Sequence, residues 1–113
     1  MITIEKIRSF ALQLRDTDEH PHFDKTAFRV RKKIFFTMND TEQRICVQLD
    51  PMMQNIFKSF NDKLIHPVPN KWGKHGWTLV YYKQLKKAMV EDIITCAYCH
   101  VAPEELSKLY QKE

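Results

Sequence analysis

Residues 27–38 read AFRVRKKIFFTM, and the alternation in this stretch decides the fold. Phe28 and Val30 alternate with arginines, so the apolar side chains fall on one face of an extended chain. The same period of two continues through residues 34–38 and 45–49. Short turns separate the three segments. The pattern therefore predicts an antiparallel meander with one buried face.

Helical patterns lie before the first of these strands and after the third. Apolar residues three and four positions apart predict an amphipathic helix over residues 4–15, with Thr3 as its N-cap. Residues 16–21 contain the turn-rich TDEHP and are expected to break the chain after this helix. Asp50 followed by Pro51 predicts the N-cap and first position of a second, short helix.

The C-terminal half continues the mixture of strand and helix. Residues 77–82, WTLVYY, are dense in strand-forming side chains. Helical spacing resumes at Leu85, and Pro103 opens a last short helix. This order predicts an α+β fold, with an antiparallel sheet of about five strands and helices packed on one face.

The composition indicates one soluble domain. A chain of 113 residues is long enough for one core and short for two, so we expect a single domain over residues 1–113. The apolar runs are too short to cross a membrane. Glu5, Lys6 and Arg8 interrupt the place where a secretory signal needs an apolar run. We therefore expect a cytoplasmic protein with no membrane contact, whose three cysteines are reduced thiols.

The positive charge is concentrated in two blocks. Residues 26–36 and residues 63–87 contain basic side chains and no acid. The basic residues are Arg29, Arg31, Lys32 and Lys33 in the first block, and Lys63, Lys71, Lys74, Lys83, Lys86 and Lys87 in the second. If the fold brought the blocks together, one basic face would suit a polyanion. If the blocks diverge, they are ordinary solvated surfaces.

Two short patterns raise the possibility of a metal or cofactor. Cys96-Ala97-Tyr98-Cys99-His100 matches the C-x-x-C-H string that attaches c-type haem, but the chain lacks the export signal typical of such proteins. A zinc site built on the same residues would need a further ligand from His20 or His22. Those two histidines could also form an acid–base pair, but no partner for them is visible in the sequence.

No phosphate-binding loop and no nucleophile motif occurs. We therefore expect no metal, no cofactor and no catalytic residues.

Residues 70–77, NKWGKHGW, contain both glycines and both tryptophans of the chain. We expect Gly73 and Gly76 to adopt left-handed turns before the strand that starts at residue 77. Trp77 then alternates with Leu79 and is assigned to core packing. Trp72 is not assigned to the core, and it is flanked by Lys71 and Lys74.

Four segments in this order resemble the MmcQ/YjbR family of small bacterial proteins. They are HPHFDKTAFRVRKKIFFT at 20–37, VQLDP at 47–51, HPVPNKWGKHGWTLV at 66–80 and AYCHVAP at 97–103. The family has a Phe-x-Val-x-Gly-Lys-x-Phe hairpin, and Lys32 stands where its glycine is usual. The other positions match at Phe28, Val30, Lys33 and Phe35.

The resemblance implies a frataxin-like (CyaY-like) sandwich, in which helices cover one side of an antiparallel sheet. Members of the family are commonly labelled DNA-binding because of paired hairpin wings, and the resemblance brings no catalytic residues.

Charge and resemblance together suggest a non-enzymatic, monomeric module that binds double-stranded DNA through a basic hairpin and a loop. Cations would neutralise phosphates, and an aromatic ring could lie against sugar or base edges. The residues expected to make these contacts are Arg29, Arg31, Lys32, Lys33, Lys71, Trp72, Lys74 and His75.

The alternative is a protein-interaction or small-ligand adaptor with an aromatic pocket on the open face of the sheet. Its expected walls are Trp72, Tyr81, Tyr82 and Phe35.

Overall fold

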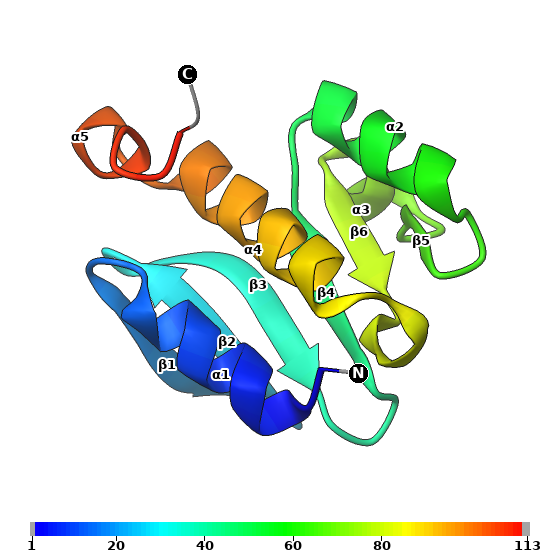
Figure 1. Ribbon diagram of the computed structural model, residues 1–113, viewed down its shortest axis with the longest axis horizontal. Coiled ribbons are helices and arrows are strands. Elements are labelled where there is room, and N and C mark those ends of the chain that lie inside the picture. Colours follow the sequence, from blue (N-terminus) through cyan, green and yellow to red (C-terminus); the bar gives the residue numbers. More distant parts are fainter. Residues whose placement is uncertain (1, 112–113) are drawn as a thin grey trace.

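Six antiparallel strands form one open sheet in the computed structural model, which describes residues 2–111 (Figure 1). The strands are β1 (Thr17–His22), β2 (Lys25–Val30), β3 (Lys33–Asn39), β4 (Arg44–Gln48), β5 (Ile65–Pro67) and β6 (Trp77–Val80). Their order across the sheet is β1-β2-β3-β4-β6-β5, and each neighbouring pair is antiparallel. The meander expected from the alternation is the β2-β3-β4 centre of this sheet.

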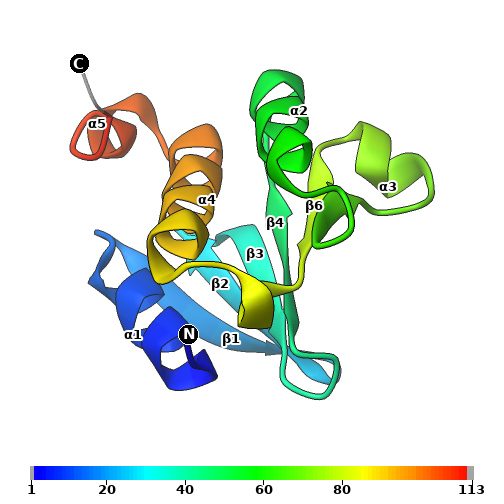
Figure 2. The same ribbon diagram turned by 45° about the vertical axis from the view of Figure 1, so that its right-hand side comes forward.

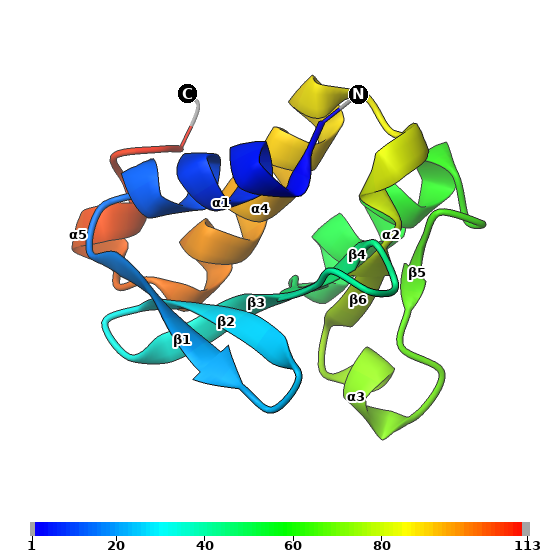
Figure 3. The ribbon, with the colours of Figure 1, turned by 90° about the horizontal axis from the view of Figure 1, so that it is seen from below.

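The helices leave one face of the sheet largely uncovered. They are α1 (Ile4–Gln13), α2 (Pro51–Phe60), α3 (Lys71–Lys74), α4 (Lys87–Val101), α5 (Glu104–Ser107) and the 3-10 helix η1 (Tyr82–Gln84). Seen from below, α1 and α4 lie on one side of the sheet and the short α3 lies on the other, beside β5 and β6 (Figure 3). Figure 2 shows α3 at the opposite edge of the molecule from α1. Within residues 2–111, no helix is long and apolar enough to cross a membrane.

The two predicted helix starts are confirmed by their hydrogen bonds. The Thr3 hydroxyl accepts from the backbone N–H of Lys6 at 3.3 Å, which caps α1. The Asp50 carboxylate accepts from the N–H of Met53 at 2.8 Å, and proline occupies the first turn of α2.

The predicted α+β class is correct, but the sheet has six strands where about five were expected. Residues 16–21 were expected to form a break, whereas Thr17–His22 form β1. The segment shows no alternation because β1 is an edge strand, paired only with β2 and mostly exposed. Pro21 is tolerated there because an edge strand can leave one backbone donor position unused.

An irregularity in the meander brings two consecutive phenylalanines into the core. Phe35 and Phe36 are both 0% exposed, although adjacent residues of a regular strand face opposite sides. The register of β2 with β3 shifts next to Phe28, which makes room for the extra residue. Phe36 then stacks on Phe28 with ring centroids 4.5 Å apart. Phe35 meets the ring of Tyr98 edge-on at 5.5 Å, which joins β3 to α4.

The β2–β3 turn forms without a glycine. Arg31 and Lys32 have φ values of 47° and 71°, the left-handed region that a tight two-residue hairpin requires. Non-glycine residues in this region cost roughly 1–2 kcal/mol each. Lys32 therefore keeps the hairpin geometry at some expense in stability and adds a positive charge at its tip.

Tyr98 holds α4 against the end of α1. Its side chain is 0% exposed, and its hydroxyl donates to the carbonyl oxygen of Arg15 at 2.6 Å. The backbone N–H of Arg15 donates in turn to the hydroxyl of Tyr110 at 3.0 Å. Burial raises the pKa of Tyr98 to about 12, because the charged phenolate would lose its hydration.

We predict that Tyr98→Phe lowers the free energy of unfolding at neutral pH by about 1–2 kcal/mol, because the Arg15 carbonyl loses its donor. The neutral phenol is favoured in the folded state, so the stabilisation by the hydroxyl is complete below pH ~10 and is lost as the pH rises through about 12. Urea unfolding across this range should show the two proteins converging in stability. A difference that stayed constant up to the highest pH would contradict the assignment.

Candidate functional site

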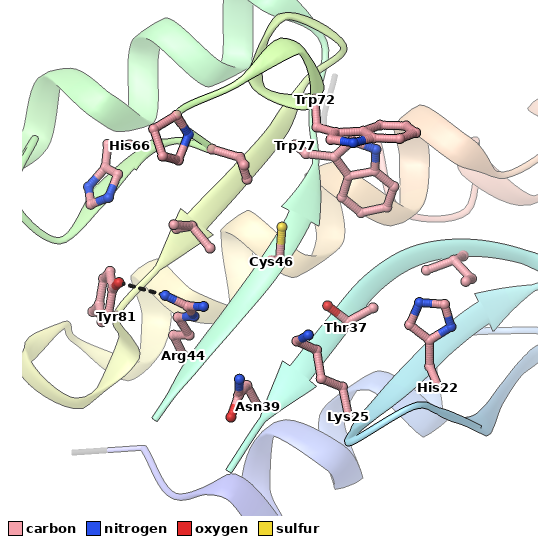
Figure 4. Close-up of a pocket in the computed structure, with 14 residues that line it drawn as sticks. His22, Lys25, Thr37, Asn39, Arg44, Cys46, His66, Trp72, Trp77 and Tyr81 are labelled. Atoms are coloured by element: carbon pink, nitrogen blue, oxygen red, sulfur yellow. Dashed lines mark hydrogen bonds between the residues drawn. The ribbon is translucent and has the colours of Figure 1, made fainter. Parts of the chain in front are cut away.

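The uncovered face of the sheet is hollowed by a pocket of about 850 Å³ (Figure 4). This volume lies within the range of about 300–1,000 Å³ that is usual for small-molecule sites. The lining residues are His22, Lys25, Ile34, Thr37, Asn39, Arg44, Cys46, His66, Val68, Pro69, Trp72, Trp77, Leu79 and Tyr81. They come from all six strands, from α3, from the loop before α3 and, in the case of Tyr81, from the residue after β6.

Strand register arranges the lining residues in rows across the sheet. Residues two apart in a strand share a face, so alternate positions of β3, β4 and β6 point into the pocket. Asn39 pairs with Arg44, Cys46 pairs with both Thr37 and Leu79, and Gln48 pairs with Trp77. The first of these rows is polar, the middle row forms the floor, and the last row is aromatic. Trp72 joins the aromatic row from α3.

The pocket carries positive charge and no lining carboxylate. Arg44 and Lys25 are its two permanent cations, and two histidines accompany them. Arg44 Nη1 donates to the Tyr81 hydroxyl at 3.0 Å, which leaves its other N–H groups available. Lys25 Nζ lies 3.6 Å from the carboxylate of Asp24, an exposed residue outside the pocket. The lining is therefore electrostatically suited to an anion.

His66 stands beside Tyr81 at the edge of the polar end. The two ring centroids are 5.8 Å apart. His66 Nδ1 lies 3.2 Å from the carbonyl oxygen of Asp62, so this nitrogen is oriented by the backbone. Figure 4 shows both rings on the same wall of the pocket.

Cys46 lies on the pocket floor and is not poised as a nucleophile. Burial raises the pKa of its thiol to about 11, although Arg44 and Lys25 act in the opposite direction. The thiol is therefore protonated at neutral pH, whereas cysteine chemistry requires the thiolate. Cys46 contributes a small apolar surface to the site.

The segment NKWGKHGW holds the aromatic end of the pocket in place through close backbone contacts. A Cβ atom on Gly73 would overlap the carbonyl oxygen of Val68, and one on Gly76 would overlap that of Leu49. Gly76 has the expected left-handed conformation, with φ of 96°. The same expectation for Gly73 is wrong, because this residue lies in α3 and is required for close packing. Gln54 Nε2 reinforces the contact by donating to the Gly73 carbonyl at 3.1 Å.

Only one of the two tryptophans has surroundings different from those predicted. Trp77 was assigned to core packing, but it is half-buried and lines the pocket on the uncovered face. Trp72 is 53% exposed at the rim. The Trp72 ring centroid lies 6.2 Å from the ring centroid of His75 and 5.9 Å from Nζ of Lys71.

The predicted DNA-contacting residues do not form one continuous surface. Arg29 pairs with Asp18 at 2.8 Å, and this hydrogen-bonded arginine holds the pKa of the carboxyl below its usual value. Arg31 lies between Asp16 at 3.0 Å and Glu105 at 2.6 Å. Both arginines of the hairpin are therefore engaged by carboxylates.

The remaining predicted contacts fall in two separate places. Lys32 and Lys33 are exposed at the β2–β3 turn, and Lys74 and His75 are exposed at α3 together with Lys71 and Trp72. The turn and α3 stand apart in Figures 1 and 3. The fold brings Lys71, Trp72, Lys74 and His75 together and leaves the hairpin residues elsewhere.

Two of the four predicted aromatic walls are wrong. Trp72 and Tyr81 line the pocket, but Phe35 and Tyr82 are 0% and 5% exposed and belong to the core. The sequence pattern missed the polar end, which combines Lys25 and Arg44 with neighbours on other strands. One signal was present: Cys46 is apolar at a position that alternates with the expected core residues of its strand and should face water, which indicates an outer face that is not fully hydrated.

The fold does not bring the residues of the C-x-x-C-H string together with His20 and His22 as a metal site. Cys96, Cys99 and His100 follow one another on α4, and Cys99 Sγ lies 3.7 Å from the carbonyl oxygen of Ser107. Among residues 2–111, no three His, Cys, Asp or Glu side chains are grouped so that they could hold a metal ion. His22 lines the pocket, whereas His20 is exposed on the edge strand.

The sheet, its one-sided helices and its open pocket define a small α+β protein with an accessible sheet face. The YjbR family model matches residues 12–100, and the chain belongs to this family. The fold is similar to the crystal structure of Deinococcus radiodurans protein DR2400, which has the DUF419 family domain. The TM-score is 0.77 at 18% sequence identity, over 96% of this chain and 88% of that one. Comparison with curated proteins gave no match.

We predict that Gly73→Ala destabilises the fold by about 1–3 kcal/mol, because the new methyl group must push α3 away from the Val68 carbonyl. Lys74→Ala, in the same helix but exposed, should change stability by less than about 0.5 kcal/mol. Urea unfolding measures both effects, and the tryptophan emission maximum reports any movement of the aromatic end. Equal stability of the two variants would show that the close contact does not matter.

Proposed function

We propose that the protein is a non-enzymatic binding module that holds a small aromatic molecule in the pocket on the uncovered sheet face. The observation that carries this proposal is the pocket itself, with aromatic side chains at one end and a few converging polar groups at the other. Sites for small molecules generally combine these features. The rigid sheet supports the pocket floor, so the cost of ordering the site on binding is small.

The chemistry of the lining favours binding over catalysis. The thiol of Cys46 is protonated at neutral pH, and no carboxylate lines the pocket to orient either histidine as a general base. The polar groups can fix the orientation of a ligand through hydrogen bonds.

A fragment panel tests the proposal directly. We expect that some members of a panel of benzoate, benzamide, benzylamine and adenosine shift the indole N–H signals of both tryptophans in NMR spectra of the labelled protein. The backbone signals of Thr37, Cys46 and Leu79 on the floor should move with them. Binding that perturbed only other surfaces, or no binding by any fragment, would refute the pocket function.

Trp72→Ala should weaken binding of any fragment identified in this way by about 1–3 kcal/mol, the range for loss of one aromatic stacking partner. Phe60→Ala is the matched control, because Phe60 is an aromatic residue of α2, 63% exposed, that does not line the pocket. NMR or calorimetric titration provides the affinities. Equal losses in the two variants would argue against a specific role for Trp72.

Binding of double-stranded DNA is a second candidate, which two pairs of exposed lysines support. Lys32 and Lys33 project at the hairpin turn, Lys71 and Lys74 project at α3, and no ion pair involves any of the four among the described residues. Such side chains can neutralise phosphates. Because the pairs stand apart, they would contact separate stretches of backbone.

For DNA we predict weak binding that falls as salt rises, with each lysine pair contributing independently. Reversal of one pair, as Lys32→Glu with Lys33→Glu or Lys71→Glu with Lys74→Glu, should reduce the slope of log affinity against log salt by about 2. Lys63→Glu with Lys83→Glu serves as the control at another exposed site. Duplex titration at several salt concentrations measures the slopes. No binding at low salt, or slopes unaffected by both reversals, would exclude this candidate.

A further inference from the structure

We propose that the pocket selects an aromatic organic anion, and that the ligand lies along the strands with its charged group at Lys25 and Arg44 and its ring at the tryptophans. This inference rests on the proposed binding function and specifies the chemical class of the ligand. It follows from the arrangement of the pocket, in which the cationic side chains lie at one end and the tryptophan rings at the other.

The polar end is built for a negatively charged group. Lys25 and Arg44 come from β2 and β4, and Asn39 comes from β3, the strand between those two. Figure 4 shows the three side chains gathered at one end of the pocket. Ammonium, amide and guanidinium groups all donate hydrogen bonds, and the two cations strengthen those bonds to an anion. The carboxylate that pairs with Lys25 belongs to Asp24. Because Asp24 is exposed, this ion pair competes only weakly with a bound anion.

The opposite end is built for a planar ring. Trp77 and Trp72 stand together there in Figure 4, one from the sheet and one from α3. Ile34 and Val68 add apolar surface to the lining. Indole rings bind planar groups by stacking, and the apolar surroundings favour removal of the ligand ring from water.

The distance between the two ends sets the length of the ligand. Arg44 and Gln48 are four residues apart on β4, and Gln48 is the partner of Trp77. With a rise of about 3.3 Å per residue, the charged row and the aromatic row lie ~13 Å apart. An extended mononucleotide or a long-chain aryl carboxylate can reach from one row to the other. A phosphate and a carboxylate are equivalent in this chemistry, so the probes must distinguish them.

Matched probes that differ in charge test the inference. Adenosine 5′-monophosphate is compared with adenosine, and 6-phenylhexanoate is compared with 6-phenylhexylamine. The readout is tryptophan fluorescence, which is local because both tryptophans of the chain line the pocket. We expect at least one anion to bind about tenfold or more tightly than its uncharged or cationic counterpart. Preference for the nucleotide identifies a phosphate ligand, and preference for the hexanoate identifies a carboxylate; either result supports the inference.

Charge-removing variants locate the anion. Lys25→Gln and Arg44→Gln should each weaken binding of the preferred anion about tenfold. They should leave binding of an uncharged counterpart unaffected and should not weaken binding of a cationic one. Lys58→Gln, at an exposed position on α2, is the control. Lys25→Gln keeps the test valid if loss of the Arg44–Tyr81 hydrogen bond disturbs folding.

Several results would overturn the inference. Equal binding of charged and uncharged probes, or anion binding that survives both substitutions, would leave a pocket that binds rings without selecting charge. In that case the proposed function stands and the anion assignment fails. If no probe binds and the fragment panel is also silent, both fail.

Discussion

The edge-on contact between Phe35 on β3 and Tyr98 on α4 fastens the long helix to the centre of the sheet. It exists because the shifted register beside Phe28 turns two adjacent phenylalanines to the same side. With α4 held there and the Tyr98 hydroxyl bonded to Arg15 at the end of α1, the helical layer is complete on one face. The other face has only the short α3 at one side, so most of its alternate side chains remain uncovered and the pocket forms there.

The floor of the pocket is formed by paired strands of the sheet, whereas its aromatic end depends on a short segment. The four-residue helix α3 is too short to be stable alone. It is held by the approach of Gly73 to Val68, by the approach of Gly76 to Leu49 and by the hydrogen bond from Gln54. These contacts explain why both glycines and both tryptophans occur in one segment. The glycines let the backbone approach the sheet closely enough to set the tryptophan rings at the pocket.

Sequence patterns predicted the parts of this structure that depend on near neighbours. The alternation around Phe28 and Val30 indicated the meander, and Thr3 and Asp50 indicated the starts of two helices. The patterns failed at β1, because an exposed edge strand has no buried face to impose alternation. They also assigned Trp77 to the core, because alternation shows that residues share a face but does not say which face the helices will cover.

The sequence by itself determined the class of fold, the family and the concentration of tryptophan and glycine in residues 70–77. Tertiary structure alone decided which charges are available: Arg29 and Arg31 meet carboxylates, whereas Lys25 and Arg44 meet in a pocket without a lining carboxylate. The physical reason is the distance in sequence between the residues that interact. Helix caps and strand alternation arise from residues a few positions apart, but a pocket and its charge arise where strands distant in sequence lie side by side.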